Sequence, residues 1–470
     1  MDKDRKLLAF GSGLCAAAVG VLLLTRLRSY PPHEDEVLAL FVARDSLGGV
    51  LDTVVTERGG APLHYLLAWG IVHLGGGLDA LRLLSVACAI ASVPLMAALA
   101  ARLSGPIRGL AAAVLASASW VFLFQGVFGR MYALFLLAAT ASFLALLARR
   151  WGWWSVATFA ALAAHPYGAL LLAAQLAYLL VSRARAALPW ALLVVAPALP
   201  LWYADFVLAG RYGEGDAPKS AGGYVREAAG DLTSGYLPVL AVFAVLAVVG
   251  FTRVRRRALV ACVFGAGLLA LVLAQVTDAS PESRHLIFLL PFTAALVAAG
   301  LPRRAVLAVP LVAALVAFEV AWGWHRTPAL FEGEPEATRT ARSQAAEWLA
   351  GTAQRGDVLH GYNPVFLAAW ERNRSFPARV VPRADADLAL DELTAAPLGR
   401  GVWVVDGDAR GSGLERRTFG SLTVFRSLED TGSAARYLDE AQDVLSGIDL
   451  ETVLEAQRRY ERSSRSTASR

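Results

Sequence analysis

The acidic stretch at residues 33–36 (HEDE) has the residue types best suited to proton transfer in this sequence. A carboxylate within hydrogen-bond reach of a hydroxyl or amine can act as a general base when that group attacks a substrate. The same stretch could instead cap a short helix over residues 37–44, because carboxylates favour helix N-termini. The local sequence leaves both interpretations open. We therefore take Asp35 and Glu36 as the candidate catalytic residues.

Two arginines are suited to binding an anion. Arg130 and Arg284 each lie where an apolar run begins, and a guanidinium matches the geometry of a phosphate group. The alternative is that both side chains only reach the lipid headgroups from the ends of membrane helices. Further polar and aromatic residues in comparable positions are candidates for lining a site: Tyr132, His165, Tyr167, His64, Tyr65 and His285.

No spacing in the sequence requires a metal ion. A divalent metal could bind the side chains of four residues, His33, Asp35, Glu36 and His165, but these residues do not form a recognisable ligand motif. We therefore assign no metal ligands, leave a divalent metal open, and expect no other cofactor.

The elements that must position these residues are mostly membrane helices. Of the 470 residues, 56% are hydrophobic and 18% are charged, whereas soluble domains contain roughly 45–50% apolar and about 25% charged residues. This composition predicts a polytopic α-helical membrane protein with about eleven transmembrane helices. The predicted spans are residues 7–25, 80–101, 107–124, 131–148, 153–164, 168–182, 186–208, 237–251, 258–275, 284–300 and 305–323.

Arginine clusters between the spans indicate the orientation of the chain. If residues 61–74 form an interfacial helix in the first outer loop (26–79) rather than a crossing, the clusters all fall on the cytoplasmic side. The N-terminus is then cytoplasmic, and the loops that carry the candidate residues lie on the outer face. Spans 153–164 and 168–182 could form one kinked helix, but arginines at both ends favour a hairpin with its tip outside.

The C-terminal part has the composition of a soluble domain. Helical patterns alternate with short apolar stretches such as residues 401–405, which predicts a small α/β domain over residues 327–462. Its position after the last span makes it extracytoplasmic, and residues 463–470 look disordered. The net charge of +5 comes from arginines that we interpret as topology signals and not as a nucleic-acid patch, so we expect no nucleic-acid partner.

The order of these motifs resembles that of the GT-C membrane glycosyltransferases. Within them, the chain looks most similar to the protein O-mannosyltransferase and aminoarabinose transferase branch (families 39 and 83). The resemblance covers residues 1–323, which we expect to be one transmembrane domain extending to residue 326. The matching pieces are Asp35-Glu36, residues 61–65 (APLHY), Arg130-Met131-Tyr132, residues 165–168 (HPYG), and Arg284-His285 with Pro291.

The resemblance implies a specific activity: hexosyl or pentosyl transfer, with inversion, from a polyprenyl-phosphate-linked sugar to a lipid, glycan or protein of the cell envelope. It implies an integral protein of a bacterial plasma membrane that works on the extracytoplasmic face, with Asp35 as general base and Arg284 as a donor-phosphate contact. Two positions depart from the family pattern. Residues 125–129 (QGVFG) lack the acid that often precedes the Arg-x-Tyr stretch, and His285 stands where a tyrosine is more usual.

Two other classes of function fit parts of the sequence. A transporter or flippase of a lipid-linked envelope precursor would also have many spans and broken helices. However, transporters often contain internal repeats, and the polar candidates here gather on one face. A third class is an inactive scaffold that binds partners through the α/β domain, and the retained Asp35 argues against it.

Overall fold

The computed structural model describes residues 3–58, 62–204, 220–276, 282–383, 385–407 and 411–468. The chain forms two compact units. Unit 1 contains Met1–Tyr30 and Asp45–Gly333, and unit 2 contains Pro31–Arg44 and Glu334–Arg470. We describe each unit by itself.

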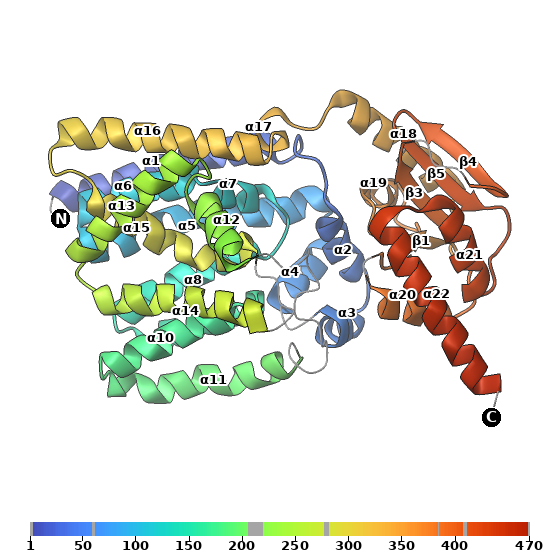
Figure 1. The fold of residues 1–470 in the computed structure, drawn as a ribbon, viewed down its shortest axis with the longest axis horizontal. Coiled ribbons are helices and arrows are strands. Elements are labelled where there is room, and N and C mark those ends of the chain that lie inside the picture. Colours follow the sequence, from blue (N-terminus) through green and yellow to red (C-terminus); the bar gives the residue numbers. More distant parts are fainter. Residues whose placement is uncertain are drawn as a thin grey trace. The chain divides into compact units, whose positions relative to one another are not determined.

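Unit 1 is a bundle of long helices that run roughly side by side (Figure 1). Shorter helices accompany them. Those in the predicted outer loops are α3 (Leu47–Thr53), a π-helical turn (Val54–Arg58), α4 (Pro62–His73) and α12 (Ala221–Leu232), and α17 (Ala329–Glu332) follows the last bundle helix. The bundle helices are α1 (Lys3–Arg26), α5 (Leu78–Ser104), α6 (Pro106–Ala118), α7 (Trp120–Val127), α8 (Tyr132–Leu147), α9 (Trp151–Ala164), α10 (Gly168–Val181), α11 (Leu188–Tyr203), α13 (Leu237–Arg253), α14 (Arg257–Val276), α15 (Leu290–Gly300) and α16 (Ala305–Arg326). Two 3₁₀ helices, η2 (Arg185–Ala187) and η4 (Ser283–Leu289), precede α11 and α15.

The predicted spans fall on helices wherever the structure describes them. By length and composition, five of the described helices can cross a membrane, or up to seven if each of two bent pairs counts as one span. The count of eleven therefore stays a prediction. Helix α4 has 12 residues, or about 18 Å at 1.5 Å per residue, which is too short for the roughly 30 Å hydrocarbon core.

The predicted hairpin at α9 and α10 is confirmed. Trp154 Nε1 donates to Gln175 Oε1 over 2.7 Å, and Thr158 Oγ1 donates to the same oxygen over 3.1 Å. A Cβ on Gly168 would lie 2.8 Å from Leu162 Cα, so the start of α10 packs against the end of α9. One kinked helix would hold Trp154 and Gln175 roughly 30 Å apart, because each residue adds about 1.5 Å.

Unit 2 is a five-stranded sheet covered by helices on both faces (Figure 1). The strand order is β2-β1-β3-β5-β4, in which β2, β1 and β3 are parallel and β5 and β4 add antiparallel. The strands are β1 (Val358–His360), β2 (Val380–Val381), β3 (Gly401–Asp406), β4 (Leu414–Phe419) and β5 (Leu422–Ser427). The helices are α2 (Glu34–Val42), α18 (Glu336–Thr352), α19 (Pro364–Arg372), α20 (Ala386–Thr394), α21 (Ala434–Val444) and α22 (Gly447–Ala468).

The sequence predicts most of these elements, with three differences. Strand β4 was not expected, because its LERRTF sequence shows no apolar alternation and forms a charged edge of the sheet. Helix α22 continues to Ala468, into the segment that the sequence suggests is disordered. Unit 2 also includes residues 31–44 from the predicted first outer loop, far from the rest of the unit in sequence.

Candidate functional site

Six of the predicted site residues come together in unit 1, where the start of α8, the tip of the α9–α10 hairpin and η4 meet. We call them the arginine–histidine cluster: Arg130, Tyr132, His165, Tyr167, Arg284 and His285.

Rings from all three elements are in contact. The ring centroids of His165 and His285 lie 5.3 Å apart, and Tyr132 lies 5.3 Å from His165. Tyr167 lies 4.7 Å from His285. Phe135, one turn along α8, stacks on His165 at 5.2 Å and supports it from the bundle interior. Residues that the order of the motifs singled out are therefore neighbours in unit 1.

Local backbone geometry orients the two histidines. His165 is extended (φ −155°, ψ 134°) between the hairpin helices, and its Nδ1 accepts a 3.1 Å hydrogen bond from the Tyr167 amide. In η4, His285 Nδ1 accepts a 3.1 Å hydrogen bond from the Glu282 amide. Because Nδ1 accepts in both cases, each neutral ring carries its proton on Nε2.

Both arginines act on the same histidine. The guanidinium carbon of Arg284 lies 5.4 Å from the centre of the Tyr132 ring. Burial, followed by the positive charges of Arg284 and Arg130, lowers the pKa of His165 to about 3. The His165 ring is therefore neutral at physiological pH. The arginines supply the positive charge of the cluster, and the histidines and tyrosines supply neutral hydrogen-bonding groups.

Helix α4 brings His64 close to Arg130. His64 and Tyr65 are both buried, and their rings meet edge-on at 5.7 Å. Burial and then Arg130 lower the pKa of His64 to about 3. Among the described residues, His64 Nε2 has no hydrogen-bond partner. The burial of His64 and Tyr65 does not fit a role as simple anchors at the lipid headgroups. It agrees with the alternative that α4 borders the arginine–histidine cluster.

Asp231 is a buried acid beside the cluster that the sequence analysis missed. It lies on α12, in the predicted outer loop, and accepts a 2.6 Å hydrogen bond from Ser283 Oγ. Its other carboxylate oxygen lies 3.6 Å from Arg326 Nε. Because Ser283 directly precedes Arg284, Asp231 fixes the start of the segment that carries this arginine. The polar DLTSG sequence around Asp231 is typical of a surface loop and gives no indication that this residue is buried.

Gln125 occupies the stretch that departs from the family pattern. It lies on α7 and is buried, and within the part of the chain that the structure describes neither polar atom of its amide has a hydrogen-bond partner. Helix α7 contacts both α8 and η4. Unsatisfied buried amides are rare, so Gln125 joins the candidates for lining the site.

The structure describes Asp35 and Glu36 in unit 2, and the arginine–histidine cluster in unit 1. The two acids lie in the first turn of α2, where His33 Nδ1 accepts from the Asp35 amide over 3.1 Å. Glu36 Oε2 accepts from the His33 amide over 3.0 Å, which completes a capping box. The capping interpretation is thus correct for Glu36. The Asp35 side chain is 27% exposed, and its Oδ2 lies 4.0 Å from His33 Nδ1. No group of three or more acids, histidines or cysteines among the described residues is arranged to hold a metal ion.

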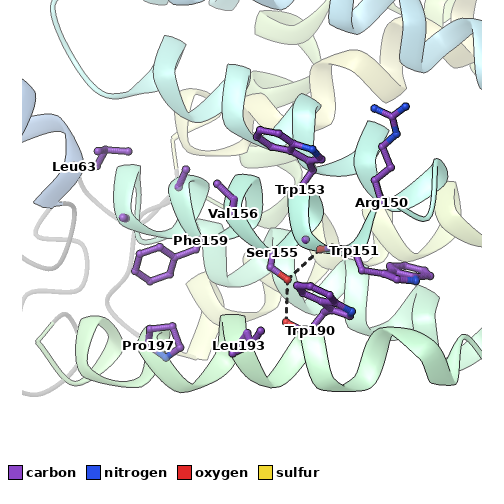
Figure 2. Close-up of a pocket in the computed structure, with 13 residues that line it drawn as sticks. Leu63, Arg150, Trp151, Trp153, Ser155, Val156, Phe159, Trp190, Leu193 and Pro197 are labelled. Carbon is purple, nitrogen blue, oxygen red and sulfur yellow. Dashed lines mark hydrogen bonds between the residues drawn. The ribbon is translucent and has the colours of Figure 1, made fainter.

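Two apolar grooves lie along the bundle helices. The first, of about 800 Å³, runs between α9 and α11, from Leu63 on α4 to Arg150 at the start of α9 (Figure 2). Figure 2 shows Ser155 near its floor, bonded to the carbonyl oxygens of Trp151 and Trp190. The second, of about 320 Å³, lies among α12, α13, α14, η4 and α15. Its lining includes Leu286, two residues after Arg284.

Comparison with known proteins identifies the fold. No family model and no curated protein sequence matches the chain. ArnT from Cupriavidus metallidurans in the apo state matches with a TM-score of 0.57 and 15% identity, over 88% of this chain and 97% of that chain. ArnT bound to undecaprenyl phosphate matches with a TM-score of 0.59 and 13% identity, over the same shares, 88% and 97%.

A second protein supports the same assignment. The arabinofuranosyltransferase AftD from mycobacteria matches with a TM-score of 0.52 and 15% identity, over 90% of this chain and 41% of that chain. All three matches are too distant in sequence to carry residue roles across. The agreement over most of the chain shows that this membrane protein has the GT-C fold of ArnT and AftD, as the order of its motifs predicted.

Proposed function

We propose that the protein is a glycosyltransferase that moves a sugar from a polyprenyl-phosphate-linked donor to an envelope acceptor on the extracytoplasmic face. The observation that carries the proposal is the convergence of Arg130 and Arg284 on one buried group of neutral histidines and tyrosines. ArnT, which has the same fold, has been solved with undecaprenyl phosphate bound.

The two arginines suit the donor phosphate. A guanidinium donates paired, charge-assisted hydrogen bonds to phosphate oxygens, and these strengthen when the site excludes water. During transfer, negative charge grows on the oxygen that links the sugar to the phosphate. Cations placed there stabilise the departing polyprenyl phosphate. The neutral histidines add hydrogen-bond donors without adding further charge.

Asp35 is the proposed general base. It removes the proton from an acceptor hydroxyl or amine as the acceptor atom bonds to the anomeric carbon. The bond from that carbon to the phosphate oxygen breaks, and polyprenyl phosphate leaves with the bonding electrons. A single displacement of this kind inverts the anomeric configuration. Glu36 is better suited to holding the first turn of α2, because its carboxylate already accepts the His33 amide.

The second groove suits the polyprenyl tail. Its lining includes Leu286, two residues after Arg284 in sequence, and consists almost entirely of apolar side chains of four helices and η4. A tail with its phosphate on Arg284 can enter this groove directly.

The test is turnover of defined donors by protein in lipid nanodiscs. Polyprenyl-phosphate sugars are offered to wild type, to Asp35→Asn and to the control Asp52→Asn, which removes an exposed acid from α3. Hydroxyl and amine acceptors are supplied, and released polyprenyl phosphate is measured. We expect turnover by wild type and by the Asp52 variant, and retained donor binding without turnover by Asp35→Asn. Donor binding by wild type without release would contradict the proposal and favour a lipid carrier.

A further inference from the structure

Helix α2, which carries Asp35, belongs to the same compact unit as the C-terminal α/β domain. It contacts α19 of that domain, although about 300 residues separate the two helices along the chain. Contacts at both ends of α2 explain this grouping.

Arg44 attaches the C-terminal end of α2. Its guanidinium donates to the carbonyl oxygens of Pro377 and Phe376, over 3.1 Å and 2.5 Å. The same guanidinium lies 5.2 Å from the centre of the Trp370 ring on α19. The Phe41 and Trp370 rings meet edge-on, with their centroids 6.2 Å apart. This end of the helix is therefore held by directional hydrogen bonds and by aromatic packing.

Arg383 attaches the N-terminal end. It follows β2, and its Nη2 lies 2.7 Å from Glu34 Oε2, at the first residue of α2. Its Nη1 lies 3.7 Å from Asp449 Oδ2 on α22. The Arg383–Glu34 pair is partly exposed, with 45% and 37% of the side chains accessible. Such pairs contribute little to stability, so this contact serves mainly to fix the position of the helix.

The two attachments leave α2 little freedom. The helix has nine residues and is about 14 Å long, and it is held at each end by a different part of the domain. The capping box at its start fixes the first turn, where Asp35 lies one residue after Glu34. The axis of the helix and the direction of its first turn are therefore both set by unit 2.

We infer that the C-terminal domain positions the proposed base, with Arg383 and Trp370 as positioning residues that act through Glu34 and Arg44. This inference rests on the proposed function. It assigns the domain a part in the transfer step itself, because a base must lie within hydrogen-bond reach of the acceptor. A misplacement of about 1 Å can lower the rate of an enzyme by about 100-fold.

The test releases α2 from the domain and leaves Asp35 in place. Arg383→Gln removes the N-terminal attachment. Glu34→Gln removes the same contact without altering the domain, in case Arg383→Gln fails to fold. Arg44→Gln loosens the other end. Arg355→Gln, an exposed arginine in the same domain, is the matched control. Full-length proteins in nanodiscs are assayed for kcat, for donor KM and for hydrogen exchange of the amides of residues 34–42.

We expect kcat to fall by about 10- to 100-fold in the attachment variants, with an unchanged donor KM and faster amide exchange in α2. The control should match wild type in all three measurements. A role limited to folding would lower the yield of active protein without the selective exchange in α2. Unchanged kcat and exchange in Arg383→Gln and Glu34→Gln, in a wild type that turns over donor, would overturn the positioning role alone. A wild type without turnover would overturn the proposed function, and the positioning role with it.

Discussion

Asp231 should make the stability of the protein depend on pH between about 4 and 6. Its side chain is 1% exposed, and burial raises its pKa to about 6, although Ser283 and Arg326 oppose the shift. In an unfolded chain the pKa is about 3.9. The native state therefore holds this proton more tightly than the unfolded state does. The resulting stabilisation is complete below about pH 4 and is lost as the pH rises to about 6.

The size of the effect follows from the pKa difference. About two pKa units, at about 1.4 kcal/mol each, amount to about 3 kcal/mol of unfolding free energy. Asp231→Asn keeps an oxygen that can accept from Ser283 but does not titrate. When the pH is raised from 4 to 6, the melting temperature of Asp231→Asn should therefore fall by several degrees less than that of wild type. Above pH 6.5 the two curves should run parallel.

The assay is thermal unfolding of wild type, Asp231→Asn and the control Asp52→Asn in the same nanodiscs, from pH 4 to pH 7. The control removes an exposed acid and should follow the wild-type curve. Other titrating groups cancel in the comparison of wild type with Asp231→Asn. If the two proteins show the same pH dependence, Asp231 is not the buried, proton-holding carboxyl described above.

Three further substitutions test the site and its support. Arg284→Gln and Arg130→Gln should each raise the donor KM by about 10- to 100-fold, because each removes charged hydrogen bonds worth about 1.5–3 kcal/mol. The control Arg102→Gln, at an exposed arginine, should leave the donor KM unchanged. An unchanged KM in both site variants would refute the role of these two arginines in binding the donor phosphate. Gln175→Leu should lower the unfolding free energy by about 2–4 kcal/mol, because it removes three buried hydrogen bonds, to Trp154, Thr158 and Ser142. The exposed Leu180→Ala on the same helix serves as control, and equal melting temperatures for the two variants would refute this estimate.

Much of the fold and part of the candidate site could be predicted from the apolar runs and the order of the motifs. The helices of the bundle and most elements of the α/β domain follow from periodicity. The six residues of the arginine–histidine cluster were singled out because each lies where an apolar run begins or ends, on the side predicted to be the outer one. Asp231 could not be found this way, since its burial depends on Ser283 and Trp322 from other helices. The attachment of α2 is likewise a long-range contact with no local pattern.

The attachment of α2 also sets an order of events during synthesis. Helix α2 emerges early, and Trp370 and Arg383 follow about 300 residues later. At roughly 5–20 residues per second, the ribosome needs tens of seconds to supply them. Throughout that interval the bundle helices can insert, while the acidic helix has no domain to hold it. A chain whose translation stops before residue 370 would therefore contain the arginine–histidine cluster, but the helix that carries the proposed base would lack its attachment. A segment that is synthesised late thus fixes the position of a helix that is synthesised early.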